Sequence, residues 1–348
     1  MKLLYAFQNP RSATSGLSIY DRRLSQALEG LGHEIQRVAL EESAPSSGYA
    51  GILRGMPPAI ARYRSRANAS LVAQAIAQFD PDRVILSHES TLYLVEQGIV
   101  PRSRAIILCH NIMAPGYRSR GTIADRIYAE LFHRYERRLT RASVPVTAIS
   151  EYDRQAAEDC YGLTMAAACP PGVIPGCSEI EADAQFAATV AISGNYDWRL
   201  KRQDISRFFD EAIAVNLPGS SSIYLSEGAA KHAPEALDHT VGLPARGSLG
   251  IGLVVDRFQA GFKLKALEYI SEGMVLVSYC DLSGEFAGLA NAQMFVHRVA
   301  HASEVPGIIE DLQRTPDLVE RYRAFQRAAF ERFQWAESAR RVMEVLED

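Results

Sequence analysis

The segment from Gly261 to Ser278 constrains the fold of this chain more than any other. It reads GFKLKALEYISEGMVLVS, with apolar residues at helical spacing followed by a glycine and an unbroken apolar run. Gly273 suits the left-handed turn that ends a helix, and the run from Met274 to Val277 suits a strand covered on both faces. The segment therefore predicts a short amphipathic helix that leads into a buried strand, a unit typical of parallel α/β sheets.

The start of that helix carries two cations. Lys263 and Lys265 stand near its first turn, where the helix dipole prefers anions. Cations and free backbone N–H groups at a helix N-terminus fit together when a phosphate binds there. A solvated loop with ordinary surface lysines is the alternative interpretation of this segment taken alone.

Strand and helix patterns alternate along the rest of the chain, which predicts a mainly parallel α/β fold. The stretch CPPGVIPG, residues 169–176, cannot continue a helix or a central strand, because prolines lack the backbone N–H group. We therefore expect an N-terminal domain over 1–170, a second α/β domain over 171–330, and a closing helix over 331–348 that packs back on the N-terminal domain.

The composition bounds the class of protein. A chain of 348 residues with 47% hydrophobic residues is long enough to bury two ordinary cores. No apolar run approaches the roughly 20 residues of a membrane span, and no signal peptide precedes the first strand pattern. Five scattered cysteines without a C-x-x-C pair favour reduced thiols over a disulfide framework or a zinc site. We therefore expect a cytoplasmic protein.

The net charge of −4 conceals an asymmetry between the two halves. Residues 1–170 carry 20 Lys and Arg against 16 Asp and Glu, a net +4, and the remainder carries 17 against 25, a net −8. This difference predicts that the two halves face different partners. The basic charge is nearly all arginine without interleaved aromatic residues, so nucleic acid is not an expected partner.

A Pro/Ser/Gly-rich stretch over 43–68 interrupts the alternation before the helix pattern LVAQAIAQF. Within it, residues 52–66 (ILRGMPPAIARYRSR) mix apolar side chains with four arginines. Such a mixture suits contact with an anionic membrane or with a lipid-pyrophosphate acceptor. An interdomain or surface loop is the alternative.

Four segments occur in an order that matches a known family. They are SGLSIYDRRLSQALEGLGHEI, ERRLTRASVPVTAISEYDRQAAEDCYG with CPPGV, ISGNYDW, and GFKLKALEYISEGMVLVS. Together they resemble the GT-B glycosyltransferases, particularly the family-4 group of nucleotide-sugar-dependent retaining enzymes. The resemblance implies two Rossmann-like α/β domains that face a cleft, with the acceptor bound by the N-terminal domain and the nucleotide sugar by the C-terminal domain.

The resemblance also implies donor-site residues. Of the two glutamates in the family's motif, the second is Glu268, which would bind the nucleotide ribose, and the first falls on Ala260. The basic pair that neutralises the diphosphate is displaced. Gly194 would let the backbone come close to the diphosphate, and Arg199 and Lys201 after it are the candidates for the basic pair. Lys263 is held in reserve for the same role. The predicted donor-binding residues are therefore Gly194, Arg199, Lys201, Lys263 and Glu268. Solvated surface charge is the alternative for the basic residues, and a helix-surface position is the alternative for Glu268.

Glycosyl transfer without a metal needs cationic side chains and N–H groups already aimed at the departing phosphate. We therefore expect no metal and no cofactor, and a nucleoside-diphosphate sugar, with a UDP-sugar favoured, as the donor substrate. The sequence Asp80-Pro81-Asp82 resembles the metal-binding motif of another glycosyltransferase fold, but it lies between a helix pattern and a strand pattern and is read as an ordinary loop.

Candidate catalytic residues lie in the N-terminal half. His110 ends the strand pattern RAIILCHN at the carboxyl tip, where open α/β sheets bind ligands, and the family's histidine at this place contacts the donor sugar. His88 is a parallel case with a weaker match. Gly16 would keep side chains out of the cleft, and Asp21 is a candidate acceptor base. The alternatives are structural histidines, a plain turn glycine and, for Asp21, a solvated helix position.

We therefore expect a glycosyltransferase that moves a sugar from a nucleoside diphosphate to a saccharide or lipid-linked acceptor in surface-glycan assembly, with retention suggested by the family. It would be cytoplasmic, with peripheral contact at the inner face of an anionic membrane. A sugar-nucleotide epimerase with the same fold is the first rival. A non-catalytic GT-B subunit, motivated by Ala260, is the second. The donor sugar, the base, the acceptor and the oligomeric state are not encoded in these motifs.

Overall fold

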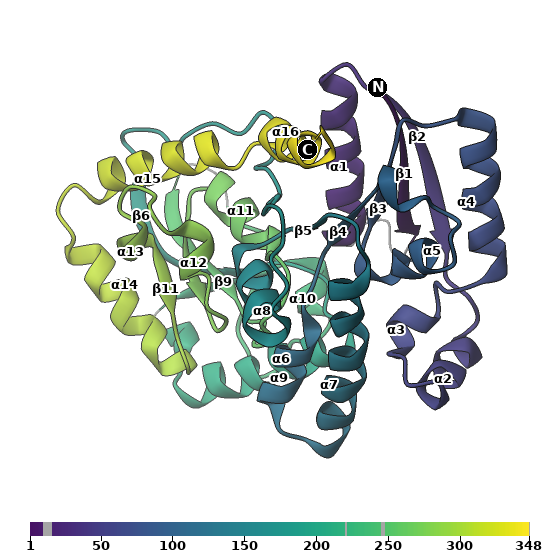
Figure 1. Cartoon of the computed structure of the whole chain (residues 1–348). Helices are drawn as coiled ribbons and strands as arrows, with labels where there is room; N and C mark the ends of the chain where they lie inside the picture. Colours follow the sequence, from purple (N-terminus) through teal and green to yellow (C-terminus); the bar gives the residue numbers. More distant parts are fainter. Residues whose placement is uncertain (10–15, 220, 245–247, 348) are drawn as a thin grey trace. The chain divides into compact units, whose positions relative to one another are not determined.

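The computed structural model describes residues 1–9, 16–219, 221–244 and 248–347 (Figure 1). The chain divides into two compact units, each with its own parallel sheet and core. Unit 1 consists of Met1–Gly172, Ala260–Phe262 and Gln334–Asp348, and unit 2 consists of Val173–Gln259 and Lys263–Phe333.

Unit 1 is built on a fully parallel sheet with strand order β2-β1-β3-β4-β5. The central strands β3 and β4 are buried along almost their whole length, as their unbroken apolar patterns predict. The strands are β1 (Lys2–Asn9), β2 (Glu34–Glu41), β3 (Arg83–Ser87), β4 (Ala105–Cys109) and β5 (Val146–Ala148).

The helices of unit 1 connect these parallel strands. They are α1 (Gly16–Gly30), α2 (Pro45–Leu53), α3 (Pro58–Ala61), α4 (Arg66–Phe79), α5 (Leu92–Glu96), α6 (Met113–Arg120), α7 (Ile123–Glu136), α8 (Glu151–Tyr161) and the closing helix α16 (Trp335–Glu347). Helix α16 packs against α1, with Trp335 edge-on to Tyr20 at 5.6 Å between ring centroids, and the Arg83 side chain donates to the Leu346 carbonyl at 3.0 Å.

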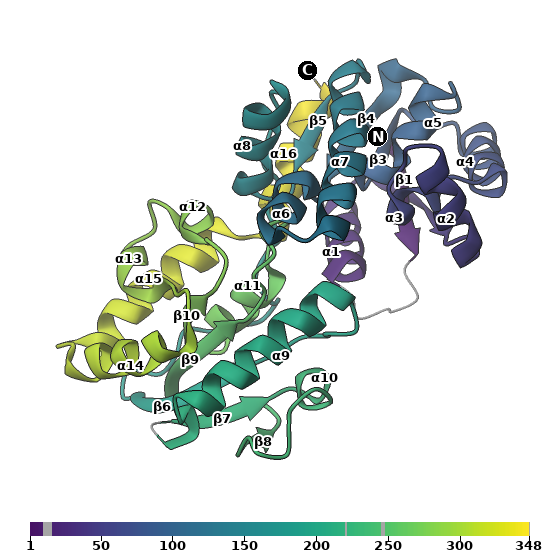
Figure 2. The same cartoon turned by 90° about the horizontal axis from the view of Figure 1, so that it is seen from below.

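Unit 2 is also built on a fully parallel sheet, in the order β11-β10-β9-β6-β7-β8. Its strands are β6 (Gln185–Ile192), β7 (Ser222–Leu225), β8 (Thr240–Val241), β9 (Ser248–Val254), β10 (Met274–Ser278) and β11 (Val296–Arg298). Figure 2 shows α9 running along one face of this sheet. The helices are α9 (Arg199–Ala214), α10 (Glu227–Ala230), α11 (Leu264–Ser271), α12 (Ser283–Phe286), α13 (Ala292–Phe295), α14 (Val305–Arg314) and α15 (Leu318–Arg332).

Both strand orders contain a point at which the direction of winding reverses. In unit 1 this point lies between β1 and β3, and in unit 2 it lies between β6 and β9. Open parallel α/β sheets bind ligands at the carboxyl ends of the strands that flank such a point. The predicted fold class, an α/β protein with two Rossmann-like sheets, is confirmed.

The segment that most constrained the sequence interpretation folds as predicted. Leu264–Ser271 form α11, Gly273 adopts the left-handed conformation with φ of 80°, and Met274–Ser278 form the buried strand β10. The expectation for the region before α4 was wrong in part. The stretch 43–68 contains helices α2 and α3, and α4 begins at Arg66, five residues before the predicted pattern, because Ser65 caps its first turn by accepting from the Asn68 N–H at 3.1 Å.

A close contact between β9 and α11 gives a stability prediction. Gly252 lies beneath Tyr269, whose ring would be 2.2 Å from a β-carbon at that position. The Tyr269 hydroxyl is fixed because it accepts from the Ser193 N–H at 2.6 Å and donates to the Leu253 carbonyl at 3.2 Å. We expect Gly252→Ala to lower the free energy of unfolding by about 1–3 kcal/mol, the usual cost of overpacking.

Urea unfolding would measure this loss, with Gly284→Ala as the control, since a β-carbon at Gly284 meets no atom within 4 Å. Equal unfolding midpoints for the two variants would contradict the tight packing of α11 on β9.

Candidate active site

The candidate site of unit 2 lies where β6 and β9 end, on either side of the reversal point of the sheet. Gly194 follows β6 closely and Asp256 follows β9. Gly194 has φ of 123°, a conformation that L side chains rarely adopt, and a β-carbon there would lie 3.1 Å from Lys265 Nζ. The predicted glycine turn is therefore confirmed as a place where the backbone conformation favours glycine and the space beside it is narrow.

Asp256 and Lys265 form a buried ion pair at the centre of this site. Asp256 Oδ2 lies 2.7 Å from Lys265 Nζ, with 1% of Asp256 and 9% of Lys265 exposed. Lys265 also donates to the Tyr196 hydroxyl at 3.1 Å. Burial alone would raise the pKa of the Asp256 carboxyl, but the lysine charges hold it well below its usual range. Burial alone would lower the pKa of Lys265, but Asp256 raises it well above its ordinary value, so both groups are charged.

Two further lysines stand around the same carboxylate. Lys201 Nζ, on α9, lies 3.8 Å from Asp256 Oδ1, and Lys263 Nζ donates to the Phe258 carbonyl at 2.9 Å. Asp256 raises the pKa of Lys201, but burial and the charges of Lys265 and Lys263 outweigh it, so this pKa is lowered. Because Lys265 already neutralises Asp256, the other two lysines are electrostatically suited to a further anion.

Glu268 lies one turn along α11 from this cluster. Its side chain is half-buried, and within the described ranges its carboxylate has no hydrogen-bond partner. Burial raises the pKa of Glu268, with Lys265 opposing that shift and Glu272 adding to it. The carboxylate is therefore an available acceptor beside a cationic cluster. Arg199, the remaining donor-site candidate, is the first residue of α9 and is exposed.

The candidate site of unit 1 is a buried hydrogen-bonded network at the reversal point between β1 and β3. Asp21 Oδ1 accepts from the Tyr5 hydroxyl at 2.9 Å and from the Ser87 hydroxyl at 2.5 Å. Ser87 Oγ lies 2.8 Å from His110 Nε2. Because Ser87 gives its one hydrogen to Asp21, His110 must donate through Nε2, which leaves its Nδ1 as an acceptor.

A second branch of this network surrounds His88. Its Nδ1 accepts from the Ser90 N–H at 3.2 Å and lies 3.0 Å from Gln8 Nε2, while its Nε2 lies 3.4 Å from Glu89 Oε1. Its backbone has φ of 83°, which is strained for a residue with a side chain. Burial lowers the pKa of His88 to about 3, so the ring is neutral, and its centroid lies 5.5 Å from that of His110.

The expectation for Asp21 was wrong in one respect. The alternative interpretation gave it a solvated helix position, but Asp21 is 2% exposed and lies inside the network. Burial raises its pKa to about 7, although the hydrogen bonds from Ser87 and Tyr5 oppose that shift. Burial likewise raises the pKa of Glu89 to about 7, and it lowers the pKa of His110 well below its ordinary value.

The remaining sequence candidates are placed as follows. Gly16 is the exposed first residue of α1, and residues 10–15 before it lie outside the described ranges. Ala260, which stands where the family motif has its first glutamate, is buried and belongs to unit 1. The loop at Asp80 and Asp82 is an ordinary one, in which Asp80 ends α4 and Asp82 accepts from the Lys2 N–H at 2.7 Å.

Comparison with known proteins gave one family match and many structural matches. The model described as Glycosyltransferase Family 4 matches residues 14–175. Sucrose-phosphate synthase from Thermosynechococcus elongatus is similar with a TM-score of 0.67 at 13% identity, covering 99% of this chain and 98% of that chain. The chain is a GT-B protein that resembles family-4 glycosyltransferases. The comparison with curated proteins gave no match.

Two further structures share the GT-B fold. A UDP-forming trehalose-phosphate synthase from Burkholderia vietnamiensis has a TM-score of 0.62 at 11% identity and covers 100% of this chain and 97% of that chain. A glycosyltransferase from Rickettsia africae has a TM-score of 0.60 at 10% identity and covers 99% and 97%. At these identities the likeness is one of fold.

Two members of the charged cluster in unit 2 lie outside the set predicted from the sequence. Lys265 stands near the predicted start of the helix, but the predicted donor-binding residues include Lys263 and not Lys265. Asp256 was missed, although an acid directly after the apolar run LGIGLVV marks the carboxyl end of a central strand. Among the described residues no group of three His, Cys, Asp or Glu side chains could hold a metal ion. No helix in the same residues could cross a membrane.

The raised pKa of Asp21 predicts a pH effect on stability. The folded state holds the proton up to about pH 7, whereas the unfolded carboxyl loses it near 3.8, so this contribution is lost as the pH rises through that window. His110 has the opposite sign, because its pKa is lowered on folding. Between about pH 5 and pH 7.5 the Asp21 carboxyl should lower the parent's free energy of unfolding by about 2 kcal/mol. We expect this decrease to be absent in Asp21→Asn, whose side chain can still accept from Tyr5 and Ser87.

Urea unfolding of parent and Asp21→Asn at both pH values would measure this difference. A parent and variant that change in parallel with pH would mean that Asp21 is ionised throughout.

Proposed function

We propose that this chain transfers a sugar from a nucleoside diphosphate, with UDP favoured, to a saccharide or lipid-linked acceptor in surface-glycan assembly. The observation that carries the proposal is the lysine cluster around Asp256, which stands beside Gly194 at the reversal point of the unit 2 sheet. A lipid-linked acceptor would bring the protein to the inner face of a membrane. The name of one structural neighbour, a UDP-forming synthase, supports the choice of nucleotide.

In this proposal unit 2 binds the donor. The diphosphate lies against the Gly194 turn, and Lys201 and Lys263 stabilise the negative charge that builds on the phosphate as its bond to the sugar breaks. The charge of Lys265 is already neutralised by Asp256, so the role of Lys265 is to hold the charged cluster together and to fix the position of α11. Glu268 accepts hydrogen bonds from the ribose hydroxyls, for which its unpartnered carboxylate is suited.

Unit 1 contributes the acceptor side. Asp21 is too deeply buried to touch a substrate, so we assign it a positioning role in which Ser87 transmits its orientation to His110. His110 is then held as one tautomer with Nδ1 available as an acceptor. The strained backbone of His88 beside it fits a residue held in place for function. Retention of configuration at the sugar is part of the proposal and rests on the family resemblance.

Ala260 favours one rival, a GT-B subunit that binds nucleotide without transfer, because the family's first glutamate is missing there. Incubation with UDP-sugars and a panel of saccharide and lipid-linked acceptors separates the two. Transfer predicts nucleotide release that depends on the acceptor, and the rival predicts nucleotide binding with no release under any acceptor.

Glu268 gives the sharpest prediction for donor binding. Glu268→Ala removes an acceptor for two ribose hydroxyls, and hydrogen bonds to charged groups contribute about 1.5–3 kcal/mol each, part of which water restores. We expect UDP to bind roughly 30- to 150-fold more weakly, or about 2–3 kcal/mol, by calorimetry. Glu272→Ala, at the end of the same helix, is the matched control and should bind UDP like the parent.

An unchanged affinity in Glu268→Ala would show that the ribose is not bound at α11. Unfolding curves of both variants should match that of the parent, because neither residue belongs to the buried core.

Metal dependence tests the electrostatic part of the proposal. If Lys201 and Lys263 replace a metal at the diphosphate, transfer should continue in excess EDTA at the parent's rate, and Lys201→Gln should reduce it. Removing one donor aimed at developing negative charge typically costs about 100- to 1,000-fold in turnover. Loss of transfer in EDTA that manganese or magnesium restores would reject the lysine-based mechanism.

A further inference from the structure

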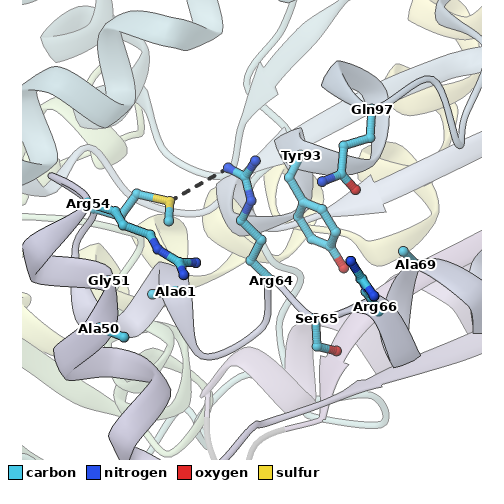
Figure 3. Close-up of a pocket in the computed structure, with 11 residues that line it drawn as sticks. Ala50, Gly51, Arg54, Ala61, Arg64, Ser65, Arg66, Ala69, Tyr93 and Gln97 are labelled. Carbon is cyan, nitrogen blue, oxygen red and sulfur yellow. Dashed lines mark hydrogen bonds between the residues drawn. The ribbon is translucent and has the colours of Figure 1, made fainter.

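Unit 1 contains a cavity of about 360 Å³ formed by the segment after β2, the start of α4 and the helix α5. This volume lies within the range of small-molecule sites. Three arginines line it: Arg54 directly after α2, Arg64 before α4, and Arg66 in the first turn of α4. In Figure 3 Arg64 and Arg66 lie on either side of Tyr93, and Arg54 lies beyond Arg64. The cavity belongs entirely to unit 1 and contains none of the residues assigned to the proposed reaction.

The charge in this cavity is unbalanced. No acidic side chain lines it, and in the part of the chain that the structure describes none of its three arginines forms an ion pair. Arg64 instead donates to Met56 Sδ at 3.6 Å, and its guanidinium lies 5.9 Å from the centre of the Tyr93 ring. By contrast Arg62, from the same segment, pairs with Glu42 at 2.8 Å and does not line the cavity. One arginine of this segment, Arg62, is therefore neutralised outside the cavity, and the three that line the cavity have no acidic partner there.

A buried hydroxyl provides an independent observation. Tyr93 is 1% exposed, and its hydroxyl has no hydrogen-bond partner among the described residues. In Figure 3 this hydroxyl is directed toward Arg66 and Ser65, at the start of α4. Burial raises the pKa of Tyr93 to about 12, with the charge of Arg64 opposing that shift. A buried donor without an acceptor is costly, and a ligand oxygen in the cavity would satisfy it.

The first turn of α4 lines one side of the cavity. Ser65 caps the helix, the helix carries no acidic residue in its first turn, and Ser65, Arg66 and Ala69 all line the cavity. The first N–H groups of a 14-residue helix and its dipole favour a bound anion. Guanidinium groups, a phenol and the start of a helix line the same cavity, which suits an anion with several terminal oxygens.

We propose that this cavity binds a terminal phosphate or diphosphate group, carried by a soluble ligand or by a lipid headgroup. The site rests on its own geometry and does not require the transfer reaction proposed above. If that reaction takes place, a phosphate-bearing acceptor is the class of molecule that would use both sites.

Calorimetry with inorganic pyrophosphate tests the cavity on the full chain. We expect binding by the parent that is about tenfold weaker in Tyr93→Phe and in Arg64→Gln, since each removes one donor to a charged group. Tyr93→Phe should unfold at the parent's temperature or above it, because its hydroxyl has no partner to lose. Arg62→Gln is the matched control and should bind pyrophosphate like the parent.

Two results would overturn the proposal. One is a parent that binds pyrophosphate no better than a dissociation constant of about 1 mM. The other is binding that Tyr93→Phe and Arg64→Gln leave unchanged, which would place the anion elsewhere, as on the lysines of unit 2. Because the readout is the difference between parent and Tyr93→Phe, it remains valid even if the chain fails to bind UDP.

Vesicle sedimentation separates the two sources of the phosphate. Sedimentation with phosphatidic acid that pyrophosphate displaces and Tyr93→Phe weakens would identify a lipid headgroup. Pyrophosphate binding without sedimentation would identify a soluble ligand. A third result is sedimentation that depends on exposed arginines but is unaffected by Tyr93→Phe and by pyrophosphate. That result would make this segment a membrane-contacting surface and would reject the cavity as a phosphate-binding site.

Discussion

The ion pair between Asp256 and Lys265 is the interaction on which the arrangement of unit 2 depends. Two charges removed from water are tolerated only when each is the other's partner, because an unpaired buried charge costs several kcal/mol. The pair joins the end of β9 to the start of α11. It also places the lysine against the turn after β6, where Gly194 has a backbone conformation that favours glycine. Lys201 and Glu268 are therefore positioned relative to one fixed point, at the place where parallel sheets bind ligands.

Each unit buries an aspartate in its candidate site, but the two aspartates are in opposite electrostatic states. Asp256 is surrounded by ammonium groups, which hold its pKa well below its usual range. Asp21 is surrounded by hydroxyl groups, which compensate for burial only in part, so its pKa rises to about 7. The difference follows from the partners, since a full charge stabilises a carboxylate in low dielectric far more than a neutral donor does. One aspartate is fixed in its charge, and the other can gain or lose a proton near neutral pH.

Much of the fold could be predicted from the sequence, because alternation of strand and helix patterns and a glycine such as Gly273 act locally. The sites were less predictable because burial of a polar side chain is decided by distant packing. Asp21 was expected to be solvated because it is a charged residue type on a helix, yet Tyr5 and Ser87 enclose it. The pairing of Asp256 with Lys265 likewise needs the loop between them to fold. No local pattern distinguishes Arg62, which has a carboxylate partner, from Arg64, which does not.

The closing helix α16 has a consequence for biosynthesis. Unit 1 combines the first 172 residues with the short segment Ala260–Phe262 and the closing helix, and α16 buries Val342, Met343 and Leu346. On a ribosome the N-terminal sheet emerges first, but the surface of α1 that packs against α16 stays uncovered until the whole of unit 2 has been made. We expect this nascent sheet to be aggregation-prone and to benefit from chaperones that bind exposed apolar surface, whereas unit 2 can complete its core without waiting for the closing helix.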